Sequence, residues 1–85
     1  MANIDIYTKS WCWFCKGAKS LLNQNGLKYV ERDVTHNRDL ETEMQNRSNR
    51  RTVPQIFIDG HHIGGFDDLS ALERTRRLDG LIGEG

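Results

Sequence analysis

Two cysteines, Cys12 and Cys15, are separated by two residues, and the 85-residue chain contains no others. A disulfide across so short a loop would stabilise the fold by only about 2 kcal/mol on the chain-entropy model. Small secreted domains that depend on disulfides carry more cysteines, spread further apart. A disulfide between them would therefore do little to stabilise the fold. The C-x-x-C spacing predicts either redox chemistry or half of a metal site.

The sequence around the pair predicts a strand, a helix and a second strand. Residues 4–8 are β-branched and aromatic, as is typical of a strand. Apolar residues then recur at the spacing of a helix face, namely Phe14, Ala18, Leu21 and Leu22. Gly26 is a stop signal for this helix, and residues 28–34, with Tyr29 and Val30 at their centre, are expected to form the second strand. A helical connection between the strands makes them parallel.

The second half of the chain predicts a surface helix, a hairpin and a last helix. Residues 38–48 are charged and lack glycine, with Leu40 and Met44 on a narrow apolar face. The Asp59-Gly60 pair between two apolar runs is a strong hairpin signal. The expected order is β-α-β-α-β-β-α, an α/β fold with a four-stranded mixed sheet flanked by three helices.

The last helix is expected to begin at Asp67, whose side chain would act as the N-cap. Its apolar face would carry Leu69, Leu72 and Leu78. Gly80 would end it, and residues 81–85 would form a frayed tail.

Composition limits the range of functions. Eighty-five residues have room for one domain, residues 1–85. Twelve basic and twelve acidic residues cancel, so no basic excess points to nucleic acid or an anionic membrane. The chain has no apolar run near the roughly 20 residues of a membrane span, and its first residues lack signal-peptide features. We expect a cytoplasmic protein that binds neither nucleic acid nor membrane.

Cys12 is placed to act as a nucleophile. It is expected where the first strand ends and the first helix begins, and a helix N-terminus favours negative charge. Residues 8–20 contain Lys9, Lys16 and Lys19 but no acid, which would further stabilise a thiolate. Cys15, one helical turn later, should be more buried and less acidic. One sulfur would attack a disulfide and the other would resolve the mixed disulfide.

A metal site is the alternative for the cysteine pair, and it needs further ligands. A closed zinc site takes four nitrogen or sulfur donors. The available residues are His36, His61 and His62. Because His61 and His62 are adjacent on a predicted strand, they point to opposite faces and do not easily share a site. No metal is expected.

Three motifs together resemble the glutaredoxin family, and within it the short bacterial type. They are the C-x-x-C pair at a helix start, Thr52-Val53-Pro54, and Gly64-Gly65-Phe66-Asp67-Asp68. The resemblance covers residues 4–78. It implies a thioredoxin fold and glutathione-dependent disulfide chemistry, with glutathione as co-substrate.

The resemblance also implies roles for individual residues. Cys12 would be the nucleophile and Cys15 the resolving thiol. A cis Val53–Pro54 bond is implied, with the Val53 backbone pairing to glutathione as an added strand would. The implied glutathione-binding residues are Lys9, Phe14, Thr52, Val53, Pro54, Gly65, Phe66, Asp67 and Asp68. Gln55 and Arg51 are further candidates for the glycyl carboxylate.

The active-site sequence departs from the family's commonest pattern, Cys-Pro-Tyr-Cys. Here the residues between the cysteines are Trp13 and Phe14. The missing proline and tyrosine hydroxyl alter the environment of the nucleophile. Trp11 and Trp13 are expected to be exposed, where they would form an apolar rim for protein substrates.

The expected function is reduction of protein disulfides and glutathione mixed disulfides by a monomer. Two alternatives stay open. One is a [2Fe–2S] cluster carrier, in which two protomers hold the cluster through the first cysteine and glutathione. The absence of proline after Cys12 permits this role, whereas the bulk of Trp13 opposes it. The other is an electron donor for ribonucleotide reductase that takes electrons from thioredoxin reductase, against which the Gly65–Asp68 subsite argues.

Overall fold

A four-stranded sheet is the framework of the fold in the computed structural model, which describes residues 2–75 and 77–81. The strands are β1 (Ile4–Thr8), β2 (Val30–Asp33), β3 (Gln55–Ile58) and β4 (His61–Gly64), in the spatial order β2-β1-β3-β4. β1 and β2 are parallel, while β1 with β3 and β3 with β4 are antiparallel. The predicted mixed sheet is confirmed.

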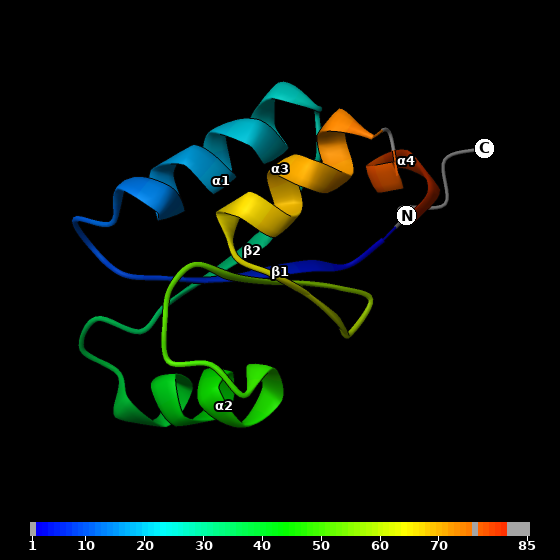
Figure 1. Cartoon of the computed structure of the whole chain (residues 1–85). Helices are drawn as coiled ribbons and strands as arrows, with labels where there is room; N and C mark the ends of the chain where they lie inside the picture. Colours follow the sequence, from blue (N-terminus) through cyan, green and yellow to red (C-terminus); the bar gives the residue numbers. More distant parts are fainter. Residues whose placement is uncertain (1, 76, 82–85) are drawn as a thin grey trace.

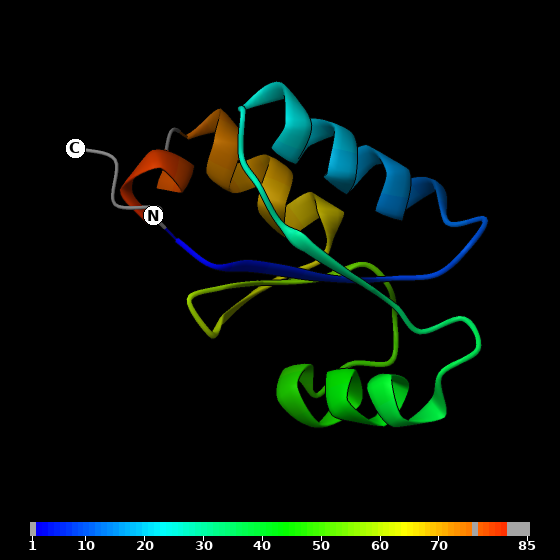
Figure 2. The ribbon, with the colours of Figure 1, turned by 180° about the vertical axis from the view of Figure 1, so that it is seen from behind.

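Helices cover both faces of this sheet. They are α1 (Trp13–Gln24), α2 (Arg38–Ser48), α3 (Phe66–Arg74) and the short α4 (Arg77–Leu81). α1 and α3 lie side by side on one face, and α2 lies alone on the other (Figures 1 and 2). This is the thioredoxin fold that the resemblance implied. None of the helices described is long and apolar enough to span a membrane.

Two apolar clusters hold the layers together. The larger lies between the sheet and the α1–α3 layer, and it consists of Ile4, Ile6, Ala18, Leu22, Ile56, Ile58, Leu69 and Leu78. The smaller faces α2 and consists of Tyr7, Val34, Met44 and Phe57. Side chains of a strand alternate between faces, so β1 and β3 each supply both clusters and form the buried centre of the sheet.

A cluster of polar contacts fastens α2 to the sheet. The buried Tyr7 hydroxyl donates to the Glu43 carboxylate and accepts from the Arg47 guanidinium at 2.7 Å. The Arg47 guanidinium also stacks 4.0 Å from the centre of the Phe57 ring. Burial and the Glu43 carboxylate raise the pKa of Tyr7, so the phenol stays protonated. These contacts fix the helix that leads into the Thr52 loop.

The hairpin between β3 and β4 turns at the predicted Asp59-Gly60 pair. Both residues have positive φ, 51° for Asp59 and 81° for Gly60. This is the backbone of a type I′ turn, which matches the twist of the flanking strands. The prediction of this hairpin is confirmed.

The second strand is shorter than expected and more exposed. It spans Val30–Asp33 in place of residues 28–34. Val30, predicted at the centre of the strand, is its first residue and is 53% exposed. The reason is that β2 is an edge strand, paired on one side with β1. Tyr29 packs against the larger apolar cluster from outside the strand.

The predicted start and end of the last helix are wrong. α3 begins at Phe66 with Gly65 as its N-cap, so Asp67 lies inside the first turn. The helix stops at Arg74, with Thr75 as the C-cap, and Leu78 packs into the core from the separate α4. Gly80 lies within α4 and does not end a helix. Of the expected tail, residues 82–85 lie outside the described residues.

Candidate active site

Cys12 lies at the junction of β1 and α1, where the first turn of the helix has backbone N–H groups without partners in the helix. It is the N-cap residue, and its sulfur accepts the backbone N–H of Cys15 across 3.1 Å. The thiol donates to the backbone carbonyl of Val53 across 3.8 Å. A helix N-terminus favours negative charge at this point, so the site suits a thiolate.

Cys15 is the buried member of the pair. It is 1% exposed, and both thiols are free. Burial raises the pKa of the Cys15 thiol to about 12, and the hydrogen-bonded Cys12 adds to this effect. Cys15 therefore keeps its proton at neutral pH, which confirms the expected burial and weak acidity of the second thiol.

The lysines near the cysteines are partly neutralised by acids from other parts of the chain. The Lys9 ammonium lies 3.1 Å from the Glu41 carboxylate of α2. The Lys19 ammonium lies 2.9 Å from the Glu31 carboxylate of β2. Glu31 has a lowered pKa, chiefly because of this pairing. The excess of positive charge expected from the local sequence is therefore smaller in the folded protein.

A pocket of about 330 Å³ opens beside Cys12. Its walls come from the first turn of α1, the segment before β3 and the start of α3. The lining residues are Phe14, Arg50, Thr52, Val53, Pro54, Gly65, Phe66, Asp67 and Asp68. The Val53–Pro54 bond within this wall is cis, as the resemblance implied.

The pocket gathers every residue that the resemblance assigned to glutathione except Lys9. Lys9 is absent from the lining and its ammonium pairs with Glu41. Arg50 also lines the pocket, although it is not among the residues that the resemblance implied. Its position two residues before Thr52 could have predicted this, because neighbouring residues of one segment can line the same side of a pocket.

The polar groups of the pocket have different tasks. The Asp68 carboxylate accepts the Gly65 N–H at 3.0 Å and pairs with the Arg50 guanidinium at 3.3 Å. Asp67 is exposed in the first turn of α3. The pocket therefore offers a cation, an exposed carboxylate and a helix N-terminus to a ligand that carries charges of both signs.

Gln55 does not face the pocket. It is fully buried, and its amide nitrogen donates to the carbonyl oxygen of Thr52 at 3.0 Å. Its amide oxygen lies 2.7 Å from Nε2 of His62. Gln55 therefore supports the Thr52 wall from behind, and its proposed contact with a carboxylate is wrong. Arg51 is exposed and is not among the lining residues.

The histidines do not gather with the cysteines. His62 stacks on Phe57, with 5.0 Å between ring centres, while His61 is exposed on the same strand. Within residues 2–75 and 77–81, no group of three or more histidine, cysteine or acidic side chains is arranged to hold a metal ion.

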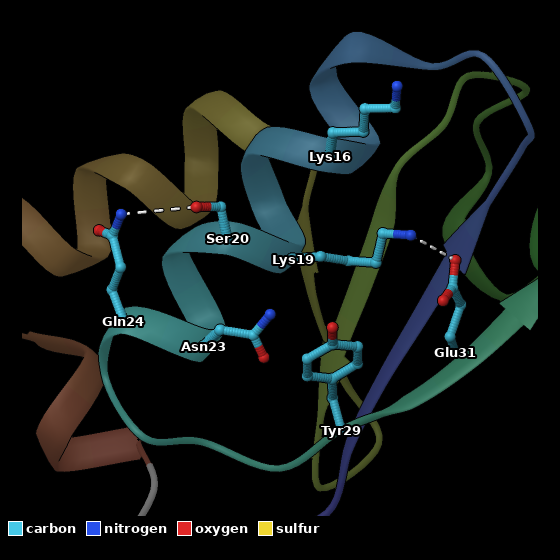
Figure 3. Close-up of a pocket in the computed structure, with 7 residues that line it drawn as sticks. All are labelled: Lys16, Lys19, Ser20, Asn23, Gln24, Tyr29 and Glu31. Atoms are coloured by element: carbon cyan, nitrogen blue, oxygen red, sulfur yellow. Dashed lines mark hydrogen bonds and ion pairs between the residues drawn. The ribbon is translucent and has the colours of Figure 1, made fainter.

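A second hollow, of about 520 Å³, lies between α1 and β2 (Figure 3). Lys19 extends across it to Glu31, and the Gln24 amide donates to the Ser20 hydroxyl at 3.4 Å. Neither cysteine lines it. Its lining includes no thiol, so disulfide chemistry belongs to the Cys12 pocket.

Both tryptophans are exposed, as expected. Trp11 is 87% exposed and Trp13 is 82% exposed. Phe14 is 61% exposed, and its ring centre lies 6.2 Å from that of Phe66. Exposed aromatic residues therefore flank Cys12 in the sequence, and one of them, Phe14, also lines the pocket.

Comparisons with known proteins agree with this site. The profile of the Glutaredoxin family matches residues 4–63. Glutaredoxin 3 of Escherichia coli is 50% identical over 82 residues, which cover 96% of this chain and 99% of that protein. The solution structure of glutaredoxin from Brucella melitensis is 46% identical, with a TM-score of 0.84, and covers 98% of this chain and 90% of its own.

A third relative carries a ligand. The crystal structure of the buckwheat glutaredoxin–glutathione complex has a TM-score of 0.86 at 28% identity and covers 95% of this chain and 76% of its own. A C-x-x-C dithiol at the start of the first helix of a thioredoxin fold defines the class of thiol–disulfide oxidoreductases. Within this class, the family match and the half-identical relative show that the chain belongs to the glutaredoxin family.

Proposed function

We propose that this chain uses glutathione to reduce glutathione mixed disulfides and disulfides of proteins. The observation that carries the proposal is the position of the Cys12 sulfur beside a pocket that suits a peptide. The sulfur lies 3.8 Å from the carbonyl of Val53, and Val53 itself lines the pocket. A bound peptide that pairs with the Val53 backbone would therefore bring its own sulfur to Cys12.

The charges of the pocket complement glutathione, which has two carboxylates and one ammonium. The N–H groups at the start of α3 suit the γ-glutamyl carboxylate, and Asp67 suits the ammonium. Arg50 pairs with Asp68 at the same helix end and adds positive charge for the γ-glutamyl carboxylate. Lys9 is the candidate for the glycyl carboxylate, because an exposed ion pair such as that with Glu41 contributes at most about 1 kcal/mol and exchanges readily. The glutathione complex of the buckwheat relative supports the same ligand.

Reduction of a glutathione mixed disulfide needs only the first cysteine. The Cys12 thiolate attacks the glutathionyl sulfur, and the substrate leaves as a thiolate that takes up a proton. A second glutathione, as thiolate, then attacks the glutathionyl sulfur on Cys12. This step releases oxidised glutathione and restores the Cys12 thiolate.

Reduction of a protein disulfide uses both cysteines. Cys12 attacks one sulfur of the substrate and forms a mixed disulfide with it. The substrate thiolate released in this step takes up the Cys15 proton, and the Cys15 thiolate attacks the Cys12 sulfur. The bond between Cys12 and the substrate breaks, the second substrate sulfur leaves as a thiolate, and the Cys12–Cys15 disulfide forms. Two glutathione molecules reduce that disulfide and become oxidised glutathione.

The test is a coupled assay with glutathione, glutathione reductase, NADPH and a small glutathione mixed disulfide. We expect turnover with the intact chain and none with Cys12→Ser. Cys15→Ser should keep activity on the small mixed disulfide and lose reduction of protein disulfides. Equal loss from both variants on the small substrate would contradict the assigned roles.

The two alternatives from the sequence have separate tests. A [2Fe–2S] carrier would be coloured when expressed and purified without oxygen. An electron donor for ribonucleotide reductase would be reduced by thioredoxin reductase and NADPH without glutathione. Both remain untested predictions.

A further inference from the structure

Exposed apolar surface is concentrated around Cys12. The large hydrophobic residues most exposed in the described part of the chain are Trp11, Trp13, Phe14 and Val30, and the first three are within two residues of Cys12. We call Trp11, Trp13 and Phe14 the aromatic rim. Concentrated exposed apolar surface marks contact surfaces rather than ordinary exteriors.

Trp11 is held in an unfavourable backbone conformation. Its φ is 60°, in the left-handed region, which costs a residue with a Cβ about 1–2 kcal/mol. The preceding residue is fixed, because the Ser10 N–H donates to the Thr35 hydroxyl at 2.8 Å. An indole that is 87% exposed recovers almost nothing by burial in the folded chain. Strain at an exposed residue next to the nucleophile favours a role in function over one in stability.

Lys16 gives the rim a positive edge. Its ammonium lies 5.3 Å from the centre of the Trp13 ring. Figure 3 shows its side chain directed away from the Lys19–Glu31 pair. Among the described residues no carboxylate lies within ion-pair distance of Lys16, whereas Lys19 is paired. An acidic group that approached the rim would therefore meet an available cation.

The rim and the pocket meet at Cys12. Phe14 lines the pocket, whereas Trp11 and Trp13 do not. A glutathionylated protein has two halves on either side of its disulfide. If the glutathionyl half fills the pocket, the protein half extends over the remaining exposed surface around Cys12.

We propose that the aromatic rim docks the protein half of the substrate and selects cysteines flanked by an apolar and an acidic residue. The apolar side chain packs on Trp11 and Trp13, and the acidic side chain pairs with Lys16. Cys12 then attacks the glutathionyl sulfur and the substrate cysteine leaves as its thiolate. This proposal rests on the proposed function, since it names the substrate class of the same site.

Two glutathionylated peptides test the selection. In one, Phe and Asp flank the cysteine; in the other, serines occupy both positions. We expect the intact chain to have a kcat/KM about tenfold or more higher for the Phe–Asp peptide, as truncation at tryptophan hot spots indicates. Equal values for the two peptides would overturn the proposal.

Variants of the rim separate docking from chemistry. Trp11→Asn suits the left-handed backbone, because asparagine tolerates positive φ. Combined with Trp13→Ala, it should lower the ratio of the two peptides' kcat/KM values to about one, while activity on a small mixed disulfide measures any separate effect on the nucleophile. Val30→Thr removes exposed apolar surface that is distant from Cys12 in the sequence. It should change neither the peptide preference nor the activity on the small substrate. Equal loss on peptide and small substrate in the rim variant would count against docking.

Fluorescence tests the docking without any chemistry. Trp11 and Trp13 are the two tryptophans of the chain, so indole emission reports on the rim alone. The Cys12→Ser, Cys15→Ser double variant is titrated with each peptide carrying serine in place of cysteine. We expect a saturable shift with the Phe–Asp peptide and none with the serine peptide. No shift at millimolar Phe–Asp peptide would overturn the docking proposal, even if the enzyme assay succeeds.

Discussion

The carboxylate of Asp68 accepts the backbone N–H of Gly65 across 3.0 Å and so closes the first turn of α3. The Gly65 N–H, and after it the guanidinium of Arg50, hold the pKa of Asp68 below its ordinary value. Asp68 is therefore ionised, and its carboxylate stabilises the start of α3. Asp67, exposed one residue earlier, is the carboxylate left available to a ligand.

The first prediction separates these two carboxylates. Asp68→Ala should lower the free energy of unfolding by about 1 kcal/mol, because it removes the side-chain hydrogen bond to the N–H of the N-cap residue Gly65. Asp67→Asn should lower the free energy of unfolding by less than about 1 kcal/mol, because it removes one charge from the first turn of α3. It should raise the KM for a glutathionylated substrate about 10- to 150-fold, because a charge-assisted hydrogen bond is lost. Urea unfolding and steady-state kinetics measure the two effects. An unchanged KM in Asp67→Asn would exclude Asp67 as the ammonium contact.

The second prediction concerns Gly64, which has a φ of 124° just before the capped turn. A Cβ there would lie 2.2 Å from the Asp68 carboxylate oxygen. Gly64→Ala should therefore add about 1–3 kcal/mol of backbone strain and also displace the Asp68 cap. Gly26→Ala is the matched control, because its φ of 68° is also positive but a Cβ meets nothing within 4 Å. Equal urea midpoints for the two variants would contradict this account.

The third prediction concerns the protonation of Cys15. Its pKa of about 12 lies above the roughly 8.5 of a free thiol, so the folded state holds this proton more tightly than the unfolded chain. This contribution to stability is complete below about pH 8.5 and is lost as pH rises towards 12. In Cys12→Ser, iodoacetamide at pH 8 should modify Cys15 more than about a hundredfold more slowly than in urea. Equal rates would show that Cys15 is neither buried nor weakly acidic.

The fourth prediction is acid destabilisation through His62. Burial, and after it the positive charge of Arg50, lower the pKa of His62, while the Asp68 carboxylate opposes them. The unfolded chain therefore binds this proton more strongly, and stability is lost as pH falls through about 6.5 towards the folded-state pKa. The urea midpoint should drop between pH 7.5 and 5.5, and it should drop less in His62→Gln. His61→Gln, at the exposed neighbouring residue, is the control and should behave like the intact chain. If the urea midpoint of His62→Gln fell as much as that of the intact chain, His62 would be excluded as the cause of the acid destabilisation.

Much of the fold was predictable because its signals are local. The helical spacing from Phe14 to Leu22, the Asp59-Gly60 turn and the charged segment of α2 each depend on a few neighbouring residues. The wrong prediction at the start of α3 concerned two adjacent residues of the same type. Asp67 and Asp68 are both good capping residues, and only the direction of the chain after Gly64 decides which carboxylate reaches the Gly65 N–H.

The dithiol, its place at a helix start and the similarity to the family could be predicted, since they depend on residue types at short spacings. The electrostatics and the walls of the site could not, because they depend on contacts between residues that are distant in the chain. Glu31 and Glu41, distant in sequence, partly neutralise the lysines near Cys12, and Arg50 joins the pocket through Asp68. Burial in the core, which no local pattern measures, keeps Cys15 protonated. Charge and desolvation act between residues that are close in space, so their effects on the site could not be predicted from neighbouring residues in the sequence.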